Sequence, residues 1–215
     1  MKLLLIGTGP GVGMAVARRF GSAGFELLMI ARDADKLRRY ETELAVDNIQ
    51  SRGFAVDIAD EAAFSALMIR LAAEHPDLDV LHYNASAYSP APPSELMLSV
   101  LHSDFQVNTV GALIAVQAFL PAMKKRGSGT IFFTGGGSAL QAPSELVSLS
   151  IGKAGMRNFA LCLADECAPL GIRVSTVTIS GMVQPGTQYD PHIIAATFWR
   201  LYQLPADTWE REVLL

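Results

Sequence analysis

Residues 2–13 of this chain read KLLLIGTGPGVG, a short apolar run followed by glycines at positions 7, 9, 11 and 13. The next segment, MAVARRFGSAG, has the apolar spacing of a helix. A strand that is apolar on both faces is typical of a parallel sheet. Glycine lets the backbone turn sharply and approach a ligand closely, and the start of a helix points free N–H groups at an anion. The stretch therefore predicts a phosphate-binding turn between a strand and a helix.

The spacing of these glycines is more specific than their number. The common dinucleotide fingerprint G-x-G-x-x-G fails in both frames, because neither Gly7 nor Gly9 has a glycine five residues later. A different version, G-x-x-x-G-x-G, fits at Gly7, Gly11 and Gly13. The alternative is a glycine-rich turn without a ligand, but so much glycine weakens a fold unless close approach is needed. The residues predicted to bind phosphate are Gly7, Gly9, Gly11, Val12 and Gly13.

Bulk properties favour one domain that binds small molecules. The chain has 215 residues, half of them hydrophobic, and a net charge of −4, so it can bury a large core and does not attract nucleic acid or anionic membranes. The longest later apolar stretch, 110–123, contains Gln117 and Pro121 and is shorter than the roughly twenty residues that span a bilayer. We therefore expect a soluble, cytoplasmic protein. Cys162 and Cys167 are expected to be buried thiols, and no metal site is predicted.

Apolar strands and amphipathic helices alternate along the whole chain, which is typical of an α/β fold. We predict a Rossmann-like, doubly wound, mostly parallel seven-stranded sheet with helices on both faces, forming one NAD(P)-binding domain over residues 1–215. The predicted strands are 2–6, 26–31, 52–57, 78–83, 129–134, 171–178 and 209–215. The predicted helices are 11–23, 33–46, 60–74, 94–124, 144–168 and 190–203.

Arg32 follows the second predicted strand, about twenty residues beyond the glycine turn, where a side chain selects between dinucleotides. An acidic residue there would accept hydrogen bonds from a free ribose 2′-hydroxyl, whereas a guanidinium offers forked donors to a 2′-phosphate. The sequence therefore favours NADP over NAD. The alternative is that Arg32 is a solvated residue at the helix start and that Asp33 only caps the helix.

Four further motifs follow at suitable positions: Asp57 in AVDIAD, Asn84 in LHYNAS, Asn108 in QVNTVG and Lys153 in SIGKAG. With the glycine turn and the order of elements, the chain resembles the short-chain dehydrogenase/reductase family over nearly its whole length. The resemblance implies that the turn holds the pyrophosphate and that Arg32 contacts the adenosine 2′-phosphate. It further implies adenine contacts from Asp57 and Ile58, a nicotinamide side lined by Asn84 and Ala85, and a ribose contact from Lys153.

The catalytic half departs from that family, whose members usually carry Tyr-x-x-x-Lys and a serine thirteen residues before the tyrosine. Here Leu149 stands four residues before Lys153, and Gly136 stands at the serine position. Lys153, Asn108 and Ser138 are the candidate catalytic residues, with Ser138 able to bind the substrate oxygen. Ser150 is a poor acid because an aliphatic hydroxyl ionises less readily than a phenol, and Tyr88 is a further alternative. Asn108 either relays protons or only ties its helix to a neighbouring backbone group.

Three possibilities for the function remain open on this sequence. One is an atypical NADP(H)-dependent oxidoreductase for an unknown carbonyl or alcohol, with the proton carried by a group other than tyrosine or by water. The second is a catalytically silent NADP(H)-binding sensor or subunit, and isomerisation or dehydration in the same pocket is a third possibility. The substrate lid after the sixth strand is expected to be reduced. The helices 94–124 and 144–168 have more apolar positions than one buried stripe requires. This predicts a homodimer or homotetramer formed through these two helices.

Overall fold

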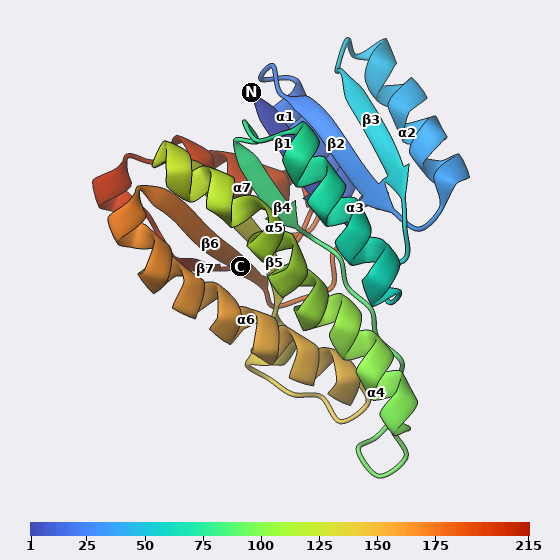
Figure 1. The fold of residues 1–215 in the computed structure, drawn as a ribbon. Coiled ribbons are helices and arrows are strands. Elements are labelled where there is room, and N and C mark those ends of the chain that lie inside the picture. Colours follow the sequence, from blue (N-terminus) through green and yellow to red (C-terminus); the bar gives the residue numbers. More distant parts are fainter.

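The computed structural model describes residues 1–215 apart from the side chain of Ala206. Seven strands form one sheet in the order β3-β2-β1-β4-β5-β6-β7 (Figure 1). All six strand pairings are parallel, so the predicted doubly wound fold is confirmed and the sheet is parallel throughout. The strands are β1 (Lys2–Ile6), β2 (Glu26–Ala31), β3 (Ser51–Ala55), β4 (Val80–Tyr83), β5 (Gly129–Gly136), β6 (Ile172–Ile179) and β7 (Glu212–Leu214).

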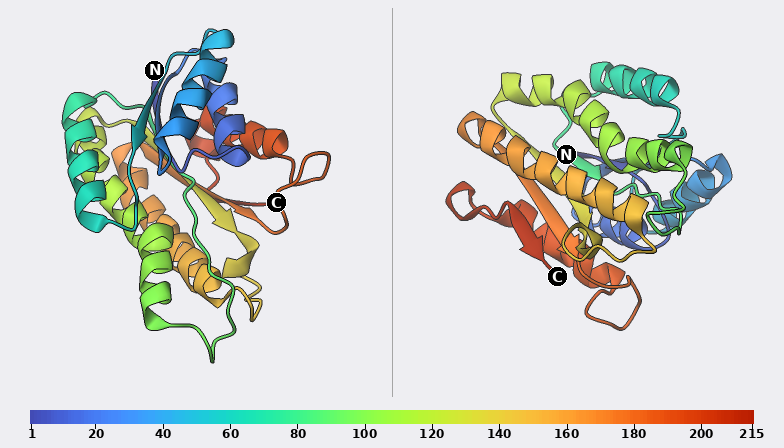
Figure 2. Two further views of the ribbon diagram at one scale, coloured as in Figure 1. Left: turned by 90° about the vertical axis from the view of Figure 1, so that its right-hand side faces the viewer. Right: turned by 90° about the horizontal axis from the view of Figure 1, so that it is seen from below.

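Helices cover both faces of the sheet, as Figure 2 shows in the view from below. One face carries α3 (Glu61–Glu74), α5 (Gly111–Arg126) and α6 (Val147–Cys167), and their apolar side chains build one core with the sheet. The other face carries α1 (Val12–Gly21), α2 (Ala34–Val46) and α7 (Pro191–Gln203), which build the second core. The winding reverses at β1, from which β2 and β3 extend to one side and β4 to β7 to the other. In such sheets, ligands bind outside the carboxyl ends of the strands at this switch point.

The central strand β1 divides its side chains between the two cores. Leu4 and Ile6 pack on the face of α3, α5 and α6, whereas Leu3 and Leu5 pack on the face of α1 and α7. All four side chains are 0% exposed, and each contributes about 1.5–3 kcal/mol by leaving water. This burial on both faces fixes the strand and places the glycine turn at the carboxyl edge of the sheet.

The longest helical run corresponds to the predicted helix 94–124, and it begins and ends slightly later in the chain. Helix α4 (Leu98–Phe105), a π-helical turn at Gln106–Val110 and α5 follow without interruption, and Pro121 lies inside α5. Among the described residues, this 29-residue run is the one helix that could cross a membrane by length and composition. The apolar stretch 110–123, which was expected to be too short for a bilayer, is only part of this run. However, 44% of its most apolar window is buried inside the structure, and much of α5 belongs to the core.

Two local expectations need correction. The last strand comprises Glu212–Leu214 and not 209–215, because residues Ala206–Thr208 form a 3₁₀ turn and Trp209 follows it. Of the two cysteines, Cys167 is buried as expected, but Cys162 is exposed. Burial raises the pKa of the Cys167 thiol, so that the buried thiol resists ionisation.

Candidate functional site

The glycine turn after β1 is pressed against the end of β4. Gly7 has a φ of +93°, and a Cβ at this position would lie 2.4 Å from the Ala85 nitrogen and 2.5 Å from its Cα. The amide Nδ2 of Asn84 donates to the Gly7 carbonyl at 2.8 Å. Only glycine fits this backbone conformation and this contact. The first glycine of the motif therefore serves the junction of two strands that are far apart in the sequence.

The turn leaves backbone donors free at the start of α1. The N–H groups of Met14 and Ala15 bind the carbonyls of Gly9 and Gly11. Within the described residues, no backbone acceptor is assigned to the N–H groups of Gly11, Val12 and Gly13. The helix has neither a side-chain cap nor an acidic residue in its first turn, and a Cβ at Gly9 would meet nothing within 4 Å. Free donors, a positive helix end and open space fit the phosphates of a dinucleotide.

A cleft of about 370 Å³ opens beside this turn at the carboxyl edge of the sheet. It brings together seven of the predicted cofactor residues: Gly7, Gly9, Arg32, Asp57, Ile58, Asn84 and Ala85. Gly11, Val12 and Gly13 continue the turn into α1 but do not line the cleft, and neither do Asn108, Ser138 and Lys153. Sequence reasoning missed Lys36, Tyr40 and Val107, which also line it. Lys36 lies in the first turn of α2, four residues after Arg32, and this closeness in sequence was the available signal.

Arg32 and Asp33 lie side by side at the mouth of the cleft but differ in their contacts. The Asp33 carboxylate caps α2 by accepting from the N–H groups of Asp35 and Lys36, at 2.9 and 3.0 Å. These bonds lower the pKa of its carboxyl group, so Asp33 stays charged and occupied as a cap. Within the described residues, the exposed Arg32 guanidinium has no ion pair. Arg32 is thus available to an anion in the cleft.

Asn108 is fully buried, and both polar atoms of its side chain bind one backbone segment. The Ala87 N–H donates to Oδ1 at 2.9 Å, and Nδ2 donates to the Ala87 carbonyl at 2.7 Å. Ala87 lines the cleft, and Asn108 sits in the π-helical turn between α4 and α5, a feature frequent at functional sites. The structure therefore gives the Asn108 side chain a positioning role, which was one of the two alternatives from the sequence.

Lys153 extends from α6 to the end of β5, where its Nζ donates to the Thr134 carbonyl at 2.8 Å. The residue is only 5% exposed, and burial lowers the pKa of its ammonium to about 8. Among the described residues, no carboxylate forms an ion pair with it. A lysine with this pKa can exchange a proton near neutral pH.

Gly136 lies between Lys153 and Ser138. A Cβ at Gly136 would lie 3.5 Å from Lys153 Cγ and 3.6 Å from Ser138 Oγ. The buried Oγ atoms of Ser138 and Ser150 have no hydrogen-bond partner in the described part of the chain. Both residues line a second, mainly apolar cavity of about 310 Å³. Buried hydroxyls without partners are costly, which makes them candidates for contact with a ligand oxygen. Tyr88 is 59% exposed and lines neither the cleft nor this cavity.

Comparison with known proteins identifies relatives along most of the chain. A family model described as short chain dehydrogenase matches residues 2–191. D-threitol dehydrogenase of Mycolicibacterium smegmatis is 29% identical over 175 residues, which cover 81% of this chain and 67% of that protein. Inactive hydroxysteroid dehydrogenase-like protein 1 of Pongo abelii is 28% identical over 173 residues, 80% of this chain and 52% of that protein.

A solved structure extends the similarity to the whole fold. The crystal structure of a metagenomic short-chain oxidoreductase in complex with NADP superposes with a TM-score of 0.90 at 25% sequence identity. The match covers 100% of this chain and 96% of that chain.

Proposed function

This chain belongs to the short-chain dehydrogenase family, and we propose on that basis that it is an NADP(H)-dependent oxidoreductase for a carbonyl or alcohol substrate. The observation that carries the proposal is one cleft that joins the open glycine turn to an unpaired Arg32 at the switch point of the sheet. The NADP complex of the structurally similar metagenomic oxidoreductase supports the same cofactor. We also propose that the chain is one cytoplasmic domain in which residues 180–190 form a shortened lid.

The proposed binding mode assigns each part of the cofactor to residues described above. The turn from Gly7 to Gly13 holds the pyrophosphate, Arg32 and Lys36 hold the 2′-phosphate, and Asp57 with Ile58 flank the adenine. Asn84 and Ala85 line the nicotinamide side, and Lys153 contacts the nicotinamide ribose. When bound, the cofactor supplies or accepts a hydride at its nicotinamide ring.

The choice of cofactor depends on Arg32 in this proposal. Arg32→Ala is expected to weaken NADPH binding by about tenfold or more, because a charge-assisted contact to phosphate is lost. NADH has no 2′-phosphate, and its affinity should change less than about twofold. Titration of both nucleotides by nicotinamide fluorescence measures the two effects. Arg39→Ala, at an exposed arginine on α2, is the matched control. Equal losses for NADPH and NADH in Arg32→Ala would contradict the assignment.

At the reacting end, we propose that Lys153 and Ser138 replace the residues that the family usually uses. Leu149 and Gly136 stand at the tyrosine and serine positions, and neither offers an acid or a hydroxyl. The lowered pKa of Lys153 suits a group that donates a proton to the substrate oxygen, directly or through water. The unpartnered Ser138 hydroxyl suits a group that holds this oxygen. A hydride-transfer assay over aldehydes, ketones and alcohols tests the proposal, and background rates in a protein that binds NADPH would contradict it.

The second candidate is an NADP(H)-binding protein without turnover. Leu149 is an apolar residue where an ionisable group is usual, and both polar atoms of the Asn108 side chain bind the Ala87 backbone. One relative, the Pongo abelii protein, carries the word inactive in its name. A sensor or subunit would bind NADPH as tightly as an enzyme but give no product from any member of the substrate panel.

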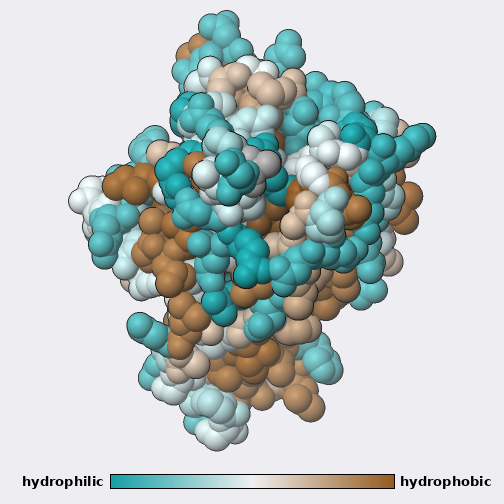
Figure 3. All heavy atoms as spheres, turned by 90° about the vertical axis from the view of Figure 1, so that its left-hand side faces the viewer, coloured by the Kyte–Doolittle hydropathy of each residue, from teal (hydrophilic) through white to brown (hydrophobic). Residues whose placement is uncertain are grey.

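We further propose a homodimer or homotetramer formed through the long helices. Leu98 on α4, Leu113 on α5 and Ile151 on α6 are 71%, 39% and 42% exposed. Figure 3 shows hydrophobic side chains gathered on the lower half of one face, at the height where Figure 1 places α4 and the start of α6. Exposed apolar groups of this kind mark association surfaces.

The double variant Leu113→Glu with Ile151→Glu is expected to reduce the assembly to a smaller species, because four or more charges would enter a closed interface. Ile69→Glu is the matched control, since Ile69 is 68% exposed on α3, outside the proposed interface. Size-exclusion chromatography with light scattering gives the molar mass of each protein. A monomeric wild-type protein, or equal masses for all three, would refute the interface.

A further inference from the structure

A larger cavity lies at the opposite edge of the sheet, where β5 and β6 begin. Its volume is about 540 Å³, compared with about 370 Å³ for the cleft at the glycine turn. The walls come from the start of β5, the start of β6, the end of α7 and the segment before β7. None of the residues assigned above to cofactor or substrate lines it. This cavity is therefore separate from the proposed active site.

Arg173 on β6 lies in the wall of this cavity with its charge uncompensated. Its Nη1 donates to the carbonyls of Tyr202 and Leu204 at 3.1 and 3.0 Å, and Nη2 donates to Thr130 Oγ1 at 3.2 Å. These acceptors are all neutral. A guanidinium has five N–H groups, so the Nε–H and one N–H of Nη2 have no assigned acceptor among the described residues. Burial lowers the pKa of Arg173, which reflects the cost of a positive charge held away from water.

The two nitrogens with spare donors form the side-on fork of an arginine. Arg157 of this chain uses the same fork to hold Glu212, with Nε–Oε1 at 2.7 Å and Nη2–Oε2 at 2.5 Å. Such a fork matches the two oxygens of a carboxylate. Arg173 thus has the free donors that a carboxylate needs.

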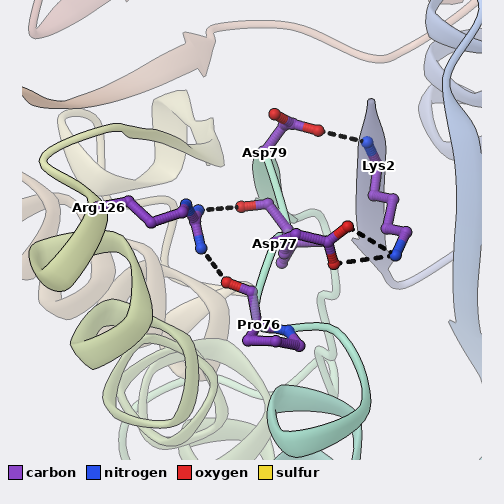
Figure 4. Close-up of polar contacts among 6 residues, drawn as sticks. Lys2, Pro76, Asp77, Asp79 and Arg126 are labelled. Carbon is purple, nitrogen blue, oxygen red and sulfur yellow. Dashed lines mark hydrogen bonds and ion pairs between the residues drawn. The ribbon is translucent and has the colours of Figure 1, made fainter.

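Two more guanidinium groups line the cavity. Arg126, at the end of α5, donates to the carbonyls of Pro76 and Leu78, which are again neutral acceptors. Arg211 pairs with the exposed Asp165. The cavity is lined by one carboxylate, that of Asp79, and its Oδ2 accepts from the Lys2 backbone N–H at 2.6 Å. Figure 4 shows Asp79 pointing to Lys2 on β1, whereas Arg126 points to the Pro76 carbonyl. The cavity therefore carries an excess of positive charge in a chain whose net charge is −4.

The remaining lining combines apolar and aromatic side chains with the polar side chains of Ser128 and Thr130. The Arg173 guanidinium carbon lies 4.8 Å from the centre of the Trp209 ring and 5.4 Å from that of Tyr202. Trp209 is held by its Nε1–H bond to the Val174 carbonyl at 2.9 Å. Ala164, Ala168, Ile172 and Val174 complete the apolar wall. A ligand that fits must therefore combine one anionic group with an apolar body.

We propose that this cavity is a second ligand site, which binds a small carboxylate with a flat apolar body, such as an aromatic acid, through the free fork of Arg173. The site is independent of the NADP(H) cleft, because it lies at the other end of the strands. The proposal does not depend on turnover or on cofactor binding.

Isothermal titration calorimetry with benzoate tests the proposal on the full chain. Benzyl alcohol probes the ring without the charge, and inorganic phosphate probes the charge without the ring. We expect benzoate to bind at least about tenfold more tightly than either, with the same affinity in saturating NADPH. Equal binding of benzyl alcohol, equal binding of phosphate, displacement by NADPH, or no benzoate binding would each overturn the proposal.

Two variants locate the site. Arg173→Gln removes the fork, and Ala168→Phe fills the cavity from an exposed position without changing the charge. Each should weaken benzoate binding by about tenfold or more. Arg200→Gln, which removes an exposed arginine paired with Glu210 outside the cavity, should stay within about twofold. Thermal unfolding confirms that each variant is folded. If Arg173→Gln does not fold, Ala168→Phe still tests the location of the site. Unchanged affinity in Ala168→Phe would refute this location.

Discussion

Gly7→Ala is expected to lower the free energy of unfolding by about 3 kcal/mol, because an added Cβ must enter the backbone of the neighbouring strand end. The Cβ would lie 2.4 Å from the Ala85 nitrogen, and the φ of +93° is already unfavourable for alanine. Either β1 or β4 must shift, and with it the hydrogen bond from Asn84 to the Gly7 carbonyl. Urea unfolding measures the loss. NADPH affinity should fall with it, since Gly7, Asn84 and Ala85 all line the cleft.

Gly24→Ala is the matched control for this prediction. Gly24 has a nearly identical φ of +89°, but a Cβ there would meet nothing within 4 Å. Its substitution therefore introduces the backbone strain alone, about 1 kcal/mol. The difference between the two variants measures the contact between the turn and Ala85. Equal losses in the free energy of unfolding would mean that the added Cβ at position 7 clashes with nothing, which would contradict the prediction.

Lys153→Met is expected to abolish turnover and to weaken NADPH binding by about tenfold or more, because it removes the one ammonium at the end of β5. Methionine keeps the length and volume of the side chain, so the fold should remain intact. Lys125→Met, at an exposed position on α5, is the matched control and should change neither quantity. Loss of turnover with unchanged affinity assigns Lys153 to proton transfer alone. Loss of affinity with no turnover in the wild type supports the silent binding protein.

Comparison of the wild type with Lys153→Met also tests the buried charge, through the pH dependence of the free energy of unfolding. Burial lowers the pKa of Lys153 from 10.5 to about 8, so the unfolded state holds more protons between these values. Stability contributed by this residue must therefore rise with pH across that window. Below pH 8 the wild type carries the full penalty, about 3 kcal/mol, and Lys153→Met should be the more stable protein. The advantage should shrink as the pH approaches 10.5, and a constant difference in urea unfolding would contradict the shift.

Local sequence patterns predicted the elements well because each pattern reflects an interaction within one element. The apolar run before Gly7 is a strand because both of its faces are buried. Asp33 caps α2, as one of the two alternatives for Arg32 and Asp33 had proposed. The helical run from 98 to 126 was predicted as 94–124, although Pro121 lies inside it. Pro121 is tolerated because it lies on the exposed side of α5, and the opposite side of the helix packs on the core and holds the helix together.

The roles of side chains within the site were harder to predict. Asn108 and Lys153 were identified as candidates, but their partners, Ala87 and the Thr134 carbonyl, lie 21 and 19 residues away. No spacing rule connects such pairs, because the contact exists only after the strands align. Val107 lines the cleft without any local signal for the same reason.

The sequence by itself determined the order of strands and helices, the glycine turn and the arginine that follows β2, since each depends on neighbours within a few residues. Only the tertiary structure decided why Gly7 must be glycine, what Asn108 holds, and that burial lowers the Lys153 pKa. It alone gathered Asp79, Arg126, Arg173 and Arg211 around one cavity. The physical reason is that close approach, burial and uncompensated charge arise between segments distant in the chain, and only the packed sheet brings those segments together.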